Sequence, residues 1–196
     1  MLLLVSIVSV GVTLAWLRAH GVTIFKLLII LALFPLFSVA SDDDGKLLEL
    51  ARKAMADARY CALITNDSES QPRARTVDPF PPDADFNVWI ATRPVTRKVG
   101  QIKANDKVTL YYWHAESSSY VTLMGRAELV DDNAIKQKMR READSDRFYP
   151  NFPDDYLLIK VTPLWIEAMV PGYRGDRQTW RASEVRFPVV GEDYET

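Results

Sequence analysis

Apolar residues are distributed along this chain in two different ways. Up to residue 41 they form two nearly continuous runs, Leu2–Leu17 and Phe25–Ala40, whereas beyond residue 41 they recur periodically. Apolar positions at helical spacing predict helices at residues 44–57, 95–105 and 131–143. Short alternating or apolar runs bounded by turn residues predict strands at residues 60–65, 73–77, 86–92, 108–113, 120–130, 156–161 and 164–170.

The periodic part, residues 42–172, is predicted to be one mainly β domain with its own core. Six or seven short strands interrupted by short helices are typical of a closed or partly closed antiparallel β-barrel. The segment 173–196 is polar and rich in Gly and Arg, with Trp180 as its one large apolar anchor. We therefore expect this last segment to be a loop or tail.

The leader, residues 1–41, is predicted to be a signal peptide or a membrane anchor. Its second apolar run has the order of a secretory signal, with Lys26 as the basic start, residues 27–37 as the apolar centre and Ser38-Val39-Ala40 as a small-residue end. If translation starts further along the chain, the first apolar run is absent and the second run acts as an ordinary signal peptide. Alternatively, both runs insert as a hairpin with Arg18 and Lys26 on the cytoplasmic side. Each interpretation places the domain outside the cytoplasm, periplasmic or secreted, and an uncleaved leader keeps it at the membrane.

Charge and cysteine content exclude several functional classes. Arg18 and Lys26 are the only charged residues before residue 42, so the remainder carries about −4 against −2 for the whole chain. A mildly acidic domain lacks the basic face that nucleic-acid binding needs. The single cysteine, Cys61, can form no intrachain disulfide, and its apolar surroundings favour a buried position. No His/Cys cluster has metal-ligand spacing and no nucleophile motif is present, so neither a metal nor a catalytic residue is predicted.

One segment has the chemistry of a phosphate receptor. Thr96-Arg97-Lys98 places a hydroxyl and two cations at the predicted start of a helix, where backbone N–H groups point outward and the dipole is positive. Thr92 precedes it by four residues at the end of a predicted strand, so both could reach one phosphate. A solvated helix start uses the same residue types, so local chemistry alone leaves both interpretations open.

Five short motifs follow one another in the periodic part. They are a Pro-x-x-Arg-x-Val strand, a strand ending in Thr, a Thr-Arg-Lys helix start, an Asn-x-x-Val strand and a Gly-x-Ala-Glu strand. They stand at Pro72–Val77, Thr92, Thr96–Lys98, Asn105–Val108 and Gly125–Glu128. In this order the motifs resemble the pyridoxamine 5′-phosphate oxidase-like superfamily of split barrels, which bind flavin mononucleotide (FMN). The general-stress-protein subgroup looks nearest, because it shares the segments found here at Ser119–Val121 and Val130–Asp132.

The resemblance implies a six- to seven-stranded antiparallel split β-barrel that binds FMN at a homodimer interface. By position, Arg75, Thr76 and Val77 would line the flavin ring and the ribityl chain. Thr92, Thr96, Arg97 and Lys98 would hold the phosphate. Aromatic residues of a second chain could cover the ring, and the candidates are Trp113, Tyr120, Trp165 and Trp180. For each of these four, core or interface packing is the alternative.

Two departures from the true oxidase change the expected reaction. Residues 78–82 are proline-rich where the oxidase has a lysine, and Tyr173–Arg177 lacks the histidine of the oxidase's C-terminal motif for the vitamin phosphate. Strong pyridoxine-phosphate oxidation is therefore not expected. The resemblance instead implies an FMN-dependent oxidoreductase of unknown substrate, with a non-catalytic, flavin-free exported binding module as the alternative. Haem binding is disfavoured, because His114 is the only histidine after residue 41.

Overall fold

The computed structural model describes residues 42–188. The predictions of a signal peptide or membrane anchor fall on residues 1–41 and so lie outside the described part. Within residues 42–188, no helix is long and apolar enough to span a membrane.

The described part consists of helices and strands that follow the predicted order. They are α3 (Asp42–Ala58), β1 (Cys61–Asn66), β2 (Pro72–Val77), β3 (Val88–Thr92), α4 (Arg97–Ala104), β4 (Lys107–His114), β5 (Ser119–Val130), α5 (Asn133–Met139), β6 (Leu157–Met169) and β7 (Ser183–Arg186). Up to β5, every predicted element is confirmed, with ends that differ by at most two residues. The architecture is therefore mainly β, as the pattern of short strands predicts.

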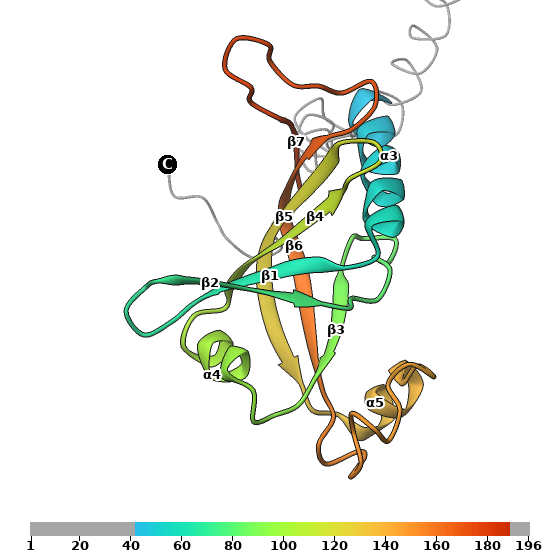
Figure 1. Cartoon of the computed structure of the whole chain (residues 1–196), viewed down its shortest axis with the longest axis vertical. Helices are drawn as coiled ribbons and strands as arrows, with labels where there is room; N and C mark the ends of the chain where they lie inside the picture. The colour runs from blue at the N-terminus through green and yellow to red at the C-terminus, as the bar shows by residue number, and fades with distance from the viewer. Residues whose placement is uncertain (1–41, 189–196) are drawn as a thin grey trace, which may run out of the picture. The chain divides into compact units, whose positions relative to one another are not determined.

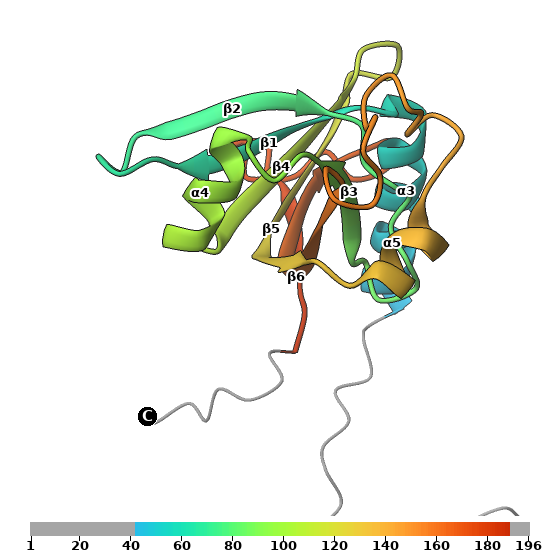
Figure 2. The ribbon, with the colours of Figure 1, turned by 90° about the horizontal axis from the view of Figure 1, so that it is seen from below.

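The strands form one antiparallel sheet in the order β2-β1-β4-β5-β6-β3, with β7 added beside β6 (Figure 1). The two ends of this path meet, because Pro79, just after β2, forms a bridge with Ile90 of β3, and the N–H of Phe80 donates to the carbonyl of Trp89 at 2.8 Å. Helix α3 packs against β4, β5 and β7, whereas α4 packs against β1 and β5 (Figure 2). The start of α4 lies near the point where the ends of the sheet meet, because a short turn joins it directly to the end of β3.

The helix α5 is shorter than the sequence pattern predicts. Asp132 caps its start by accepting a hydrogen bond from the N–H of Ile135 at 2.9 Å. The helix ends at Met139 instead of near residue 143, because the backbone at Arg140 is extended. The chain then turns back on itself, and this turn becomes one wall of the site described below.

The strand β6 runs without interruption where the pattern predicts two strands. Proline lacks the N–H that a central strand needs, so Pro163 predicts an interruption of the strand. A bulge at Leu164 of β6, opposite Met124 and Gly125 of β5, shifts the register directly beside the proline, so that the strand continues past it. Gly125 is required at this place, since a Cβ atom on it would lie 2.4 Å from the carbonyl oxygen of Thr162.

The strand β7 lies in the segment predicted to be a loop or tail, and for residues 183–186 that prediction is wrong. The strand pairs with residues 165–168 of β6, and its one apolar side chain, Val185, is buried. A run of four residues with a single apolar position gives too weak a pattern to recognise without its partner strand.

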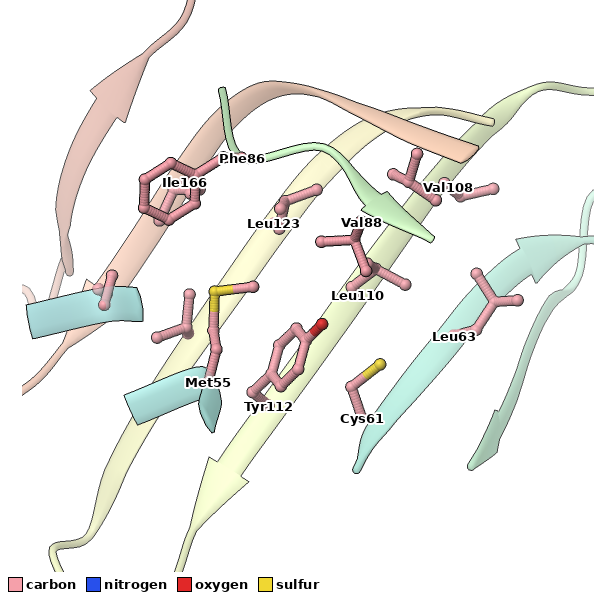
Figure 3. Packing of buried hydrophobic residues seen from close by; sticks show 14 of the residues in the cluster. Met55, Cys61, Leu63, Phe86, Val88, Val108, Leu110, Tyr112, Leu123 and Ile166 are labelled. Atoms are coloured by element: carbon pink, nitrogen blue, oxygen red, sulfur yellow. The ribbon is translucent and has the colours of Figure 1, made fainter. Parts of the chain in front are cut away.

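The core lies on the inner face of the curved sheet. Alternate residues of the central strands point into it, among them Leu63, Leu110, Leu123 and Ile166, and α3 covers it with Met55 (Figure 3). Burying such side chains supplies most of the stability of a domain of this size. Cys61 is buried in the same cluster, as expected, and burial raises the pKa of its thiol to about 12. It is therefore a packing residue and not a reactive thiol.

Candidate functional site

A pocket of about 430 Å³ opens where the ends of β2 and β3 and the start of α4 come together. Its lining residues are Thr76, Val77, Asp78, Ala91, Thr92, Arg93, Thr96, Lys98, Arg141, Ala143, Asp144, Phe148 and Tyr149. Five of the predicted site residues are among them: Thr76, Val77, Thr92, Thr96 and Lys98. The volume lies in the range of pockets that hold small organic ligands.

One corner of the pocket combines two hydroxyls with a cation. The hydroxyl oxygens of Thr92 and Thr96 lie 3.2 Å apart, and Thr96 also donates to the carbonyl of Arg93 at 3.0 Å. A turn from Arg93 to Thr96, closed by a backbone hydrogen bond of 3.1 Å, leads from β3 into α4. This turn brings Thr92, Thr96 and Lys98 to one corner although they belong to different elements.

The start of α4 is left open for an anion. Thr96 occupies the position before the helix, but its side chain makes no capping hydrogen bond. The backbone N–H groups of Arg97 and Lys98 make no hydrogen bond within residues 42–188. Free N–H groups and the positive end of the helix dipole favour an anion at such a place.

Positive side chains around this helix start have no acidic partner among the described residues. Arg75, Arg97 and Lys98 form no ion pair within residues 42–188. Burial, and then the charge of Arg75, lowers the pKa of Lys98, and burial, and then the charge of Arg97, lowers the pKa of Arg75. A bound anion would relieve both effects, because it favours the charged forms.

The predicted residues Arg75 and Arg97 do not line the pocket. The guanidinium of Arg75 donates to the hydroxyl of Thr65 at 2.6 Å and to the side-chain oxygen of Gln101 at 2.8 Å. It thereby ties β2 to β1 and α4. Arg97 is exposed at the first position of α4. These two residues place positive charge near the pocket but do not form part of its lining.

The opposite wall of the pocket comes from the turn after α5. It is held by an ion pair between the half-buried Arg141 and the buried Asp144. Arg141 binds the carboxylate of Asp144 through two hydrogen bonds, of 3.1 Å from Nε and 3.0 Å from Nη2. The hydroxyl of Tyr156 donates to the same carboxylate at 3.0 Å. Burial opposes ionisation of Asp144, but the hydrogen bonds and charge of Arg141 outweigh it and keep the pKa of Asp144 below its usual range.

Arg141 also joins this wall to the segment after β2. Its guanidinium donates to the backbone oxygen of Asp78 at 3.3 Å and lies 4.1 Å from the centre of the Phe80 ring. With most of its N–H groups engaged in this way, Arg141 acts as a fixed link between two walls.

Sequence reasoning missed this second wall and also Arg93. Residues 141–149 are far from β2 and β3 in the sequence, and no motif marks them, so only the folded chain reveals their place. Arg93 directly follows Thr92, and its position beside a predicted site residue was a usable signal.

The aromatic residues predicted to cover a flavin ring lie elsewhere in the chain. Trp113, Tyr120 and Trp165 are on the outer face of β4, β5 and β6, and Trp180 is exposed in the segment before β7. None of the four lines the pocket of its own chain. A larger hollow of about 850 Å³ lies between the start of α3 and residues 171–183, but it contains no predicted site residue.

The chemistry of the lining fits a ligand with an anionic end and a flat or apolar body. The hydroxyls, Lys98 and the open helix start form the anion corner, while Val77, Ala91 and Phe148 supply apolar surface. Burial raises the pKa of the remaining lining phenol, Tyr149, to about 12, and that of Asp144 is lowered. Neither group exchanges protons readily near neutral pH, so redox chemistry here would depend on a bound cofactor.

Comparisons with known proteins give a consistent picture. A family model described as pyridoxamine 5′-phosphate oxidase matches residues 47–169. No curated protein matches the chain. Among solved structures, general stress protein 26 from Bacillus anthracis strain Sterne has a TM-score of 0.57 and 22% identity, covering 72% of this chain and 98% of that chain.

Two further solved structures show the same fold. A protein related to general stress protein 26 from Clostridium acetobutylicum has a TM-score of 0.62 and 20% identity, covering 73% of this chain and 96% of that chain. A pyridoxamine 5′-phosphate oxidase-related, FMN binding protein from Nostoc punctiforme has a TM-score of 0.54 and 15% identity, covering 77% of this chain and 99% of that chain. The family match spans strands β1 to β6 and all seven predicted site residues. The chain therefore belongs to the pyridoxamine 5′-phosphate oxidase family, whose members include FMN-binding split barrels.

Proposed function

We propose that the pocket between β2, β3 and α4 binds FMN and that the protein is an FMN-dependent oxidoreductase. FMN supplies the capacity to accept and donate a hydride or electrons when it is bound. The protein's part is to bind the phosphate, to orient the ring and to exclude water.

The observation that carries this proposal is the open start of α4 beside cations that lack acidic partners. Thr92, Thr96 and Lys98 line the pocket there, and Arg75 and Arg97 add positive charge nearby. Without an anion this arrangement costs free energy, because desolvation and mutual repulsion oppose each charge. A phosphate at the same place would accept hydrogen bonds from N–H, O–H and ammonium donors together.

The alternative is an exported split barrel that binds no flavin. We propose export of the domain on the basis of the apolar leader, and an exported protein is separated from the cytoplasm, where FMN is made. A barrel that had abandoned FMN would have little physical reason to keep unpaired cations at an open helix start. We therefore favour the flavin-binding function.

Titration of the purified protein with FMN and with riboflavin tests the proposal. FMN fluorescence should be quenched with a dissociation constant in the micromolar range or below, and riboflavin, which lacks the phosphate, should bind more weakly. A protein that quenches neither flavin at micromolar concentration would favour the flavin-free alternative.

We also propose that two copies of the chain associate through the outer face of β4, β5 and β6. Alternating positions on this face carry Tyr111, Trp113, Tyr120, Met124, Trp165 and Met169, with Thr122 and Glu167 among them. Arg186 of β7 lies 5.4 Å from the ring centre of Trp165 and covers part of it. Tyr111 and Trp113 are 37% and 49% exposed. A face this rich in aromatic side chains suits a two-fold pairing of identical surfaces.

Replacing Trp113 with lysine should weaken this association at least about 10-fold, because large aromatic residues contribute strongly to interfaces and a buried cation opposes them. Analytical ultracentrifugation measures the dimer dissociation constant. Val95, which is 84% exposed at the turn before α4, provides a control, and Val95→Lys should leave the constant unchanged. A wild-type protein that sediments as a monomer at high concentration would contradict the dimer.

A further inference from the structure

Tyr149 is a second polar group at the pocket whose partner is missing. Its side chain lines the pocket and is only 8% exposed. Its hydroxyl makes no hydrogen bond within residues 42–188. The neighbouring Tyr156, by contrast, donates to Asp144 at 3.0 Å. The ring is buried, but the hydroxyl is not among the fully buried atoms that lack a partner, so it is open to the pocket and free to bind a ligand there.

The ring of Tyr149 is held in place by its surroundings. It packs edge-on against Tyr156, with ring centres 4.7 Å apart, and its backbone N–H donates to the carbonyl of Ser145 at 3.0 Å. Burial, followed by the charge of Asp144, raises the pKa of the hydroxyl to about 12. The group therefore keeps its proton under ordinary conditions and can donate one hydrogen bond from a fixed position.

Arg93 lies on the other side of the same pocket and is also without an acidic partner. It follows β3 directly, its side chain is exposed, and it forms no ion pair within residues 42–188. Its charge acts on Tyr149, whose pKa it lowers slightly against the larger effect of burial. A cation and a neutral hydrogen-bond donor thus face one pocket from two walls.

We propose that Arg93 and Tyr149 together bind an anionic phosphate group across the pocket from each other. This deepens the proposed function and rests on it, since the phosphate is either that of FMN itself or that of a second molecule bound beside FMN. In the first case the pair grips the oxygens that Thr92, Thr96 and Lys98 leave free. In the second it determines that the substrate carries a phosphate.

The variants Arg93→Gln and Tyr149→Phe test the pair. Controls of the same chemistry are Arg147→Gln and Tyr60→Phe, since neither residue lines the pocket. Each test variant should lower FMN affinity at least about 10-fold, the effect of losing one hydrogen bond to a charged group, while riboflavin affinity stays unchanged. The controls should bind both flavins as the wild type does, and thermal unfolding should show that all four variants are folded.

A second titration distinguishes the source of the phosphate. If the test variants keep full FMN affinity, inorganic phosphate is titrated into the FMN-loaded protein and followed by ³¹P NMR. Phosphate binding by the wild type that both variants lose would assign the pair to a second molecule. If FMN affinity and phosphate binding are both unchanged in the variants, the pair is not an anion site.

Failure of the proposed function would look different. A wild-type protein that binds no flavin removes FMN from the site but leaves the pair testable, because inorganic phosphate can be titrated into the protein alone. Binding that is lost in Arg93→Gln and Tyr149→Phe would uphold the pair, and phosphate binding that is absent from the wild type would overturn it.

Discussion

Replacing Lys98 with methionine should weaken FMN binding about 30-fold, as expected for the loss of a charge-assisted hydrogen bond to the phosphate. Lys98 lines the pocket, is half-buried and has no acidic partner among the described residues, so its charge is directed at whatever fills the corner. Methionine keeps the length and apolar stem of the side chain. Fluorescence titration with FMN measures the change.

Two controls define the meaning of this result. Riboflavin affinity should be the same for the wild type and for Lys98→Met, because riboflavin has no phosphate. Arg97→Met removes a neighbouring charge that lies outside the pocket and should reduce FMN affinity no more than about 5-fold, since an exposed charge is screened by solvent. Equal losses for FMN and riboflavin would mean that Lys98 does not contact the phosphate.

Removing either member of the Arg141–Asp144 pair should lower the free energy of unfolding by about 2 kcal/mol, less than for a fully buried pair, because the side chain of Arg141 is 25% exposed. Arg141→Met leaves the carboxylate of Asp144 buried, with Tyr156 as its one remaining side-chain donor. Asp144→Ala leaves the hydroxyl of Tyr156 without its acceptor and leaves Arg141 with only its longer polar contacts to Asp78 and Pro79. Urea denaturation followed by tryptophan fluorescence measures the loss.

The pair also predicts a pH dependence. Because the pKa of Asp144 is lowered in the folded state, its contribution is complete above the unfolded value of about 3.9 and is lost as the pH falls through the folded value. The difference in stability between the wild type and Asp144→Ala should therefore shrink below about pH 4. The exposed pair of Lys53 and Asp57 is the control, and Lys53→Met should change stability hardly at all. A destabilisation by Asp144→Ala that persists unchanged in acid would contradict this account.

Local patterns were enough to predict the fold as far as β5. Helical spacing indicates α3 and alternation indicates β5, because each buries one face against the same core. The sequence of β2 also alternates, although Val77 is its one buried residue. The same patterns fail where tertiary contacts override them. Pro163 predicts a strand break unless the bulge at Leu164 beside it is known, and β7 is recognisable only beside β6.

The candidate site likewise has residues that local sequence predicts and residues that only long-range contacts place. Thr92, Thr96 and Lys98 lie within seven residues of one another, so their meeting follows from one strand end and one helix start. Tyr149 and Asp144 reach the pocket only because the chain turns back after α5, and that turn depends on Arg141 finding its partners. Long-range placement of this kind leaves no periodic trace in the sequence.

A crystal structure of the protein with FMN bound tests the central claim most directly. The account predicts the phosphate at the start of α4, with its oxygens within hydrogen-bonding distance of the hydroxyls of Thr92 and Thr96 and the ammonium of Lys98. A phosphate found instead in the larger hollow between α3 and residues 171–183, or anywhere else away from α4, would contradict it.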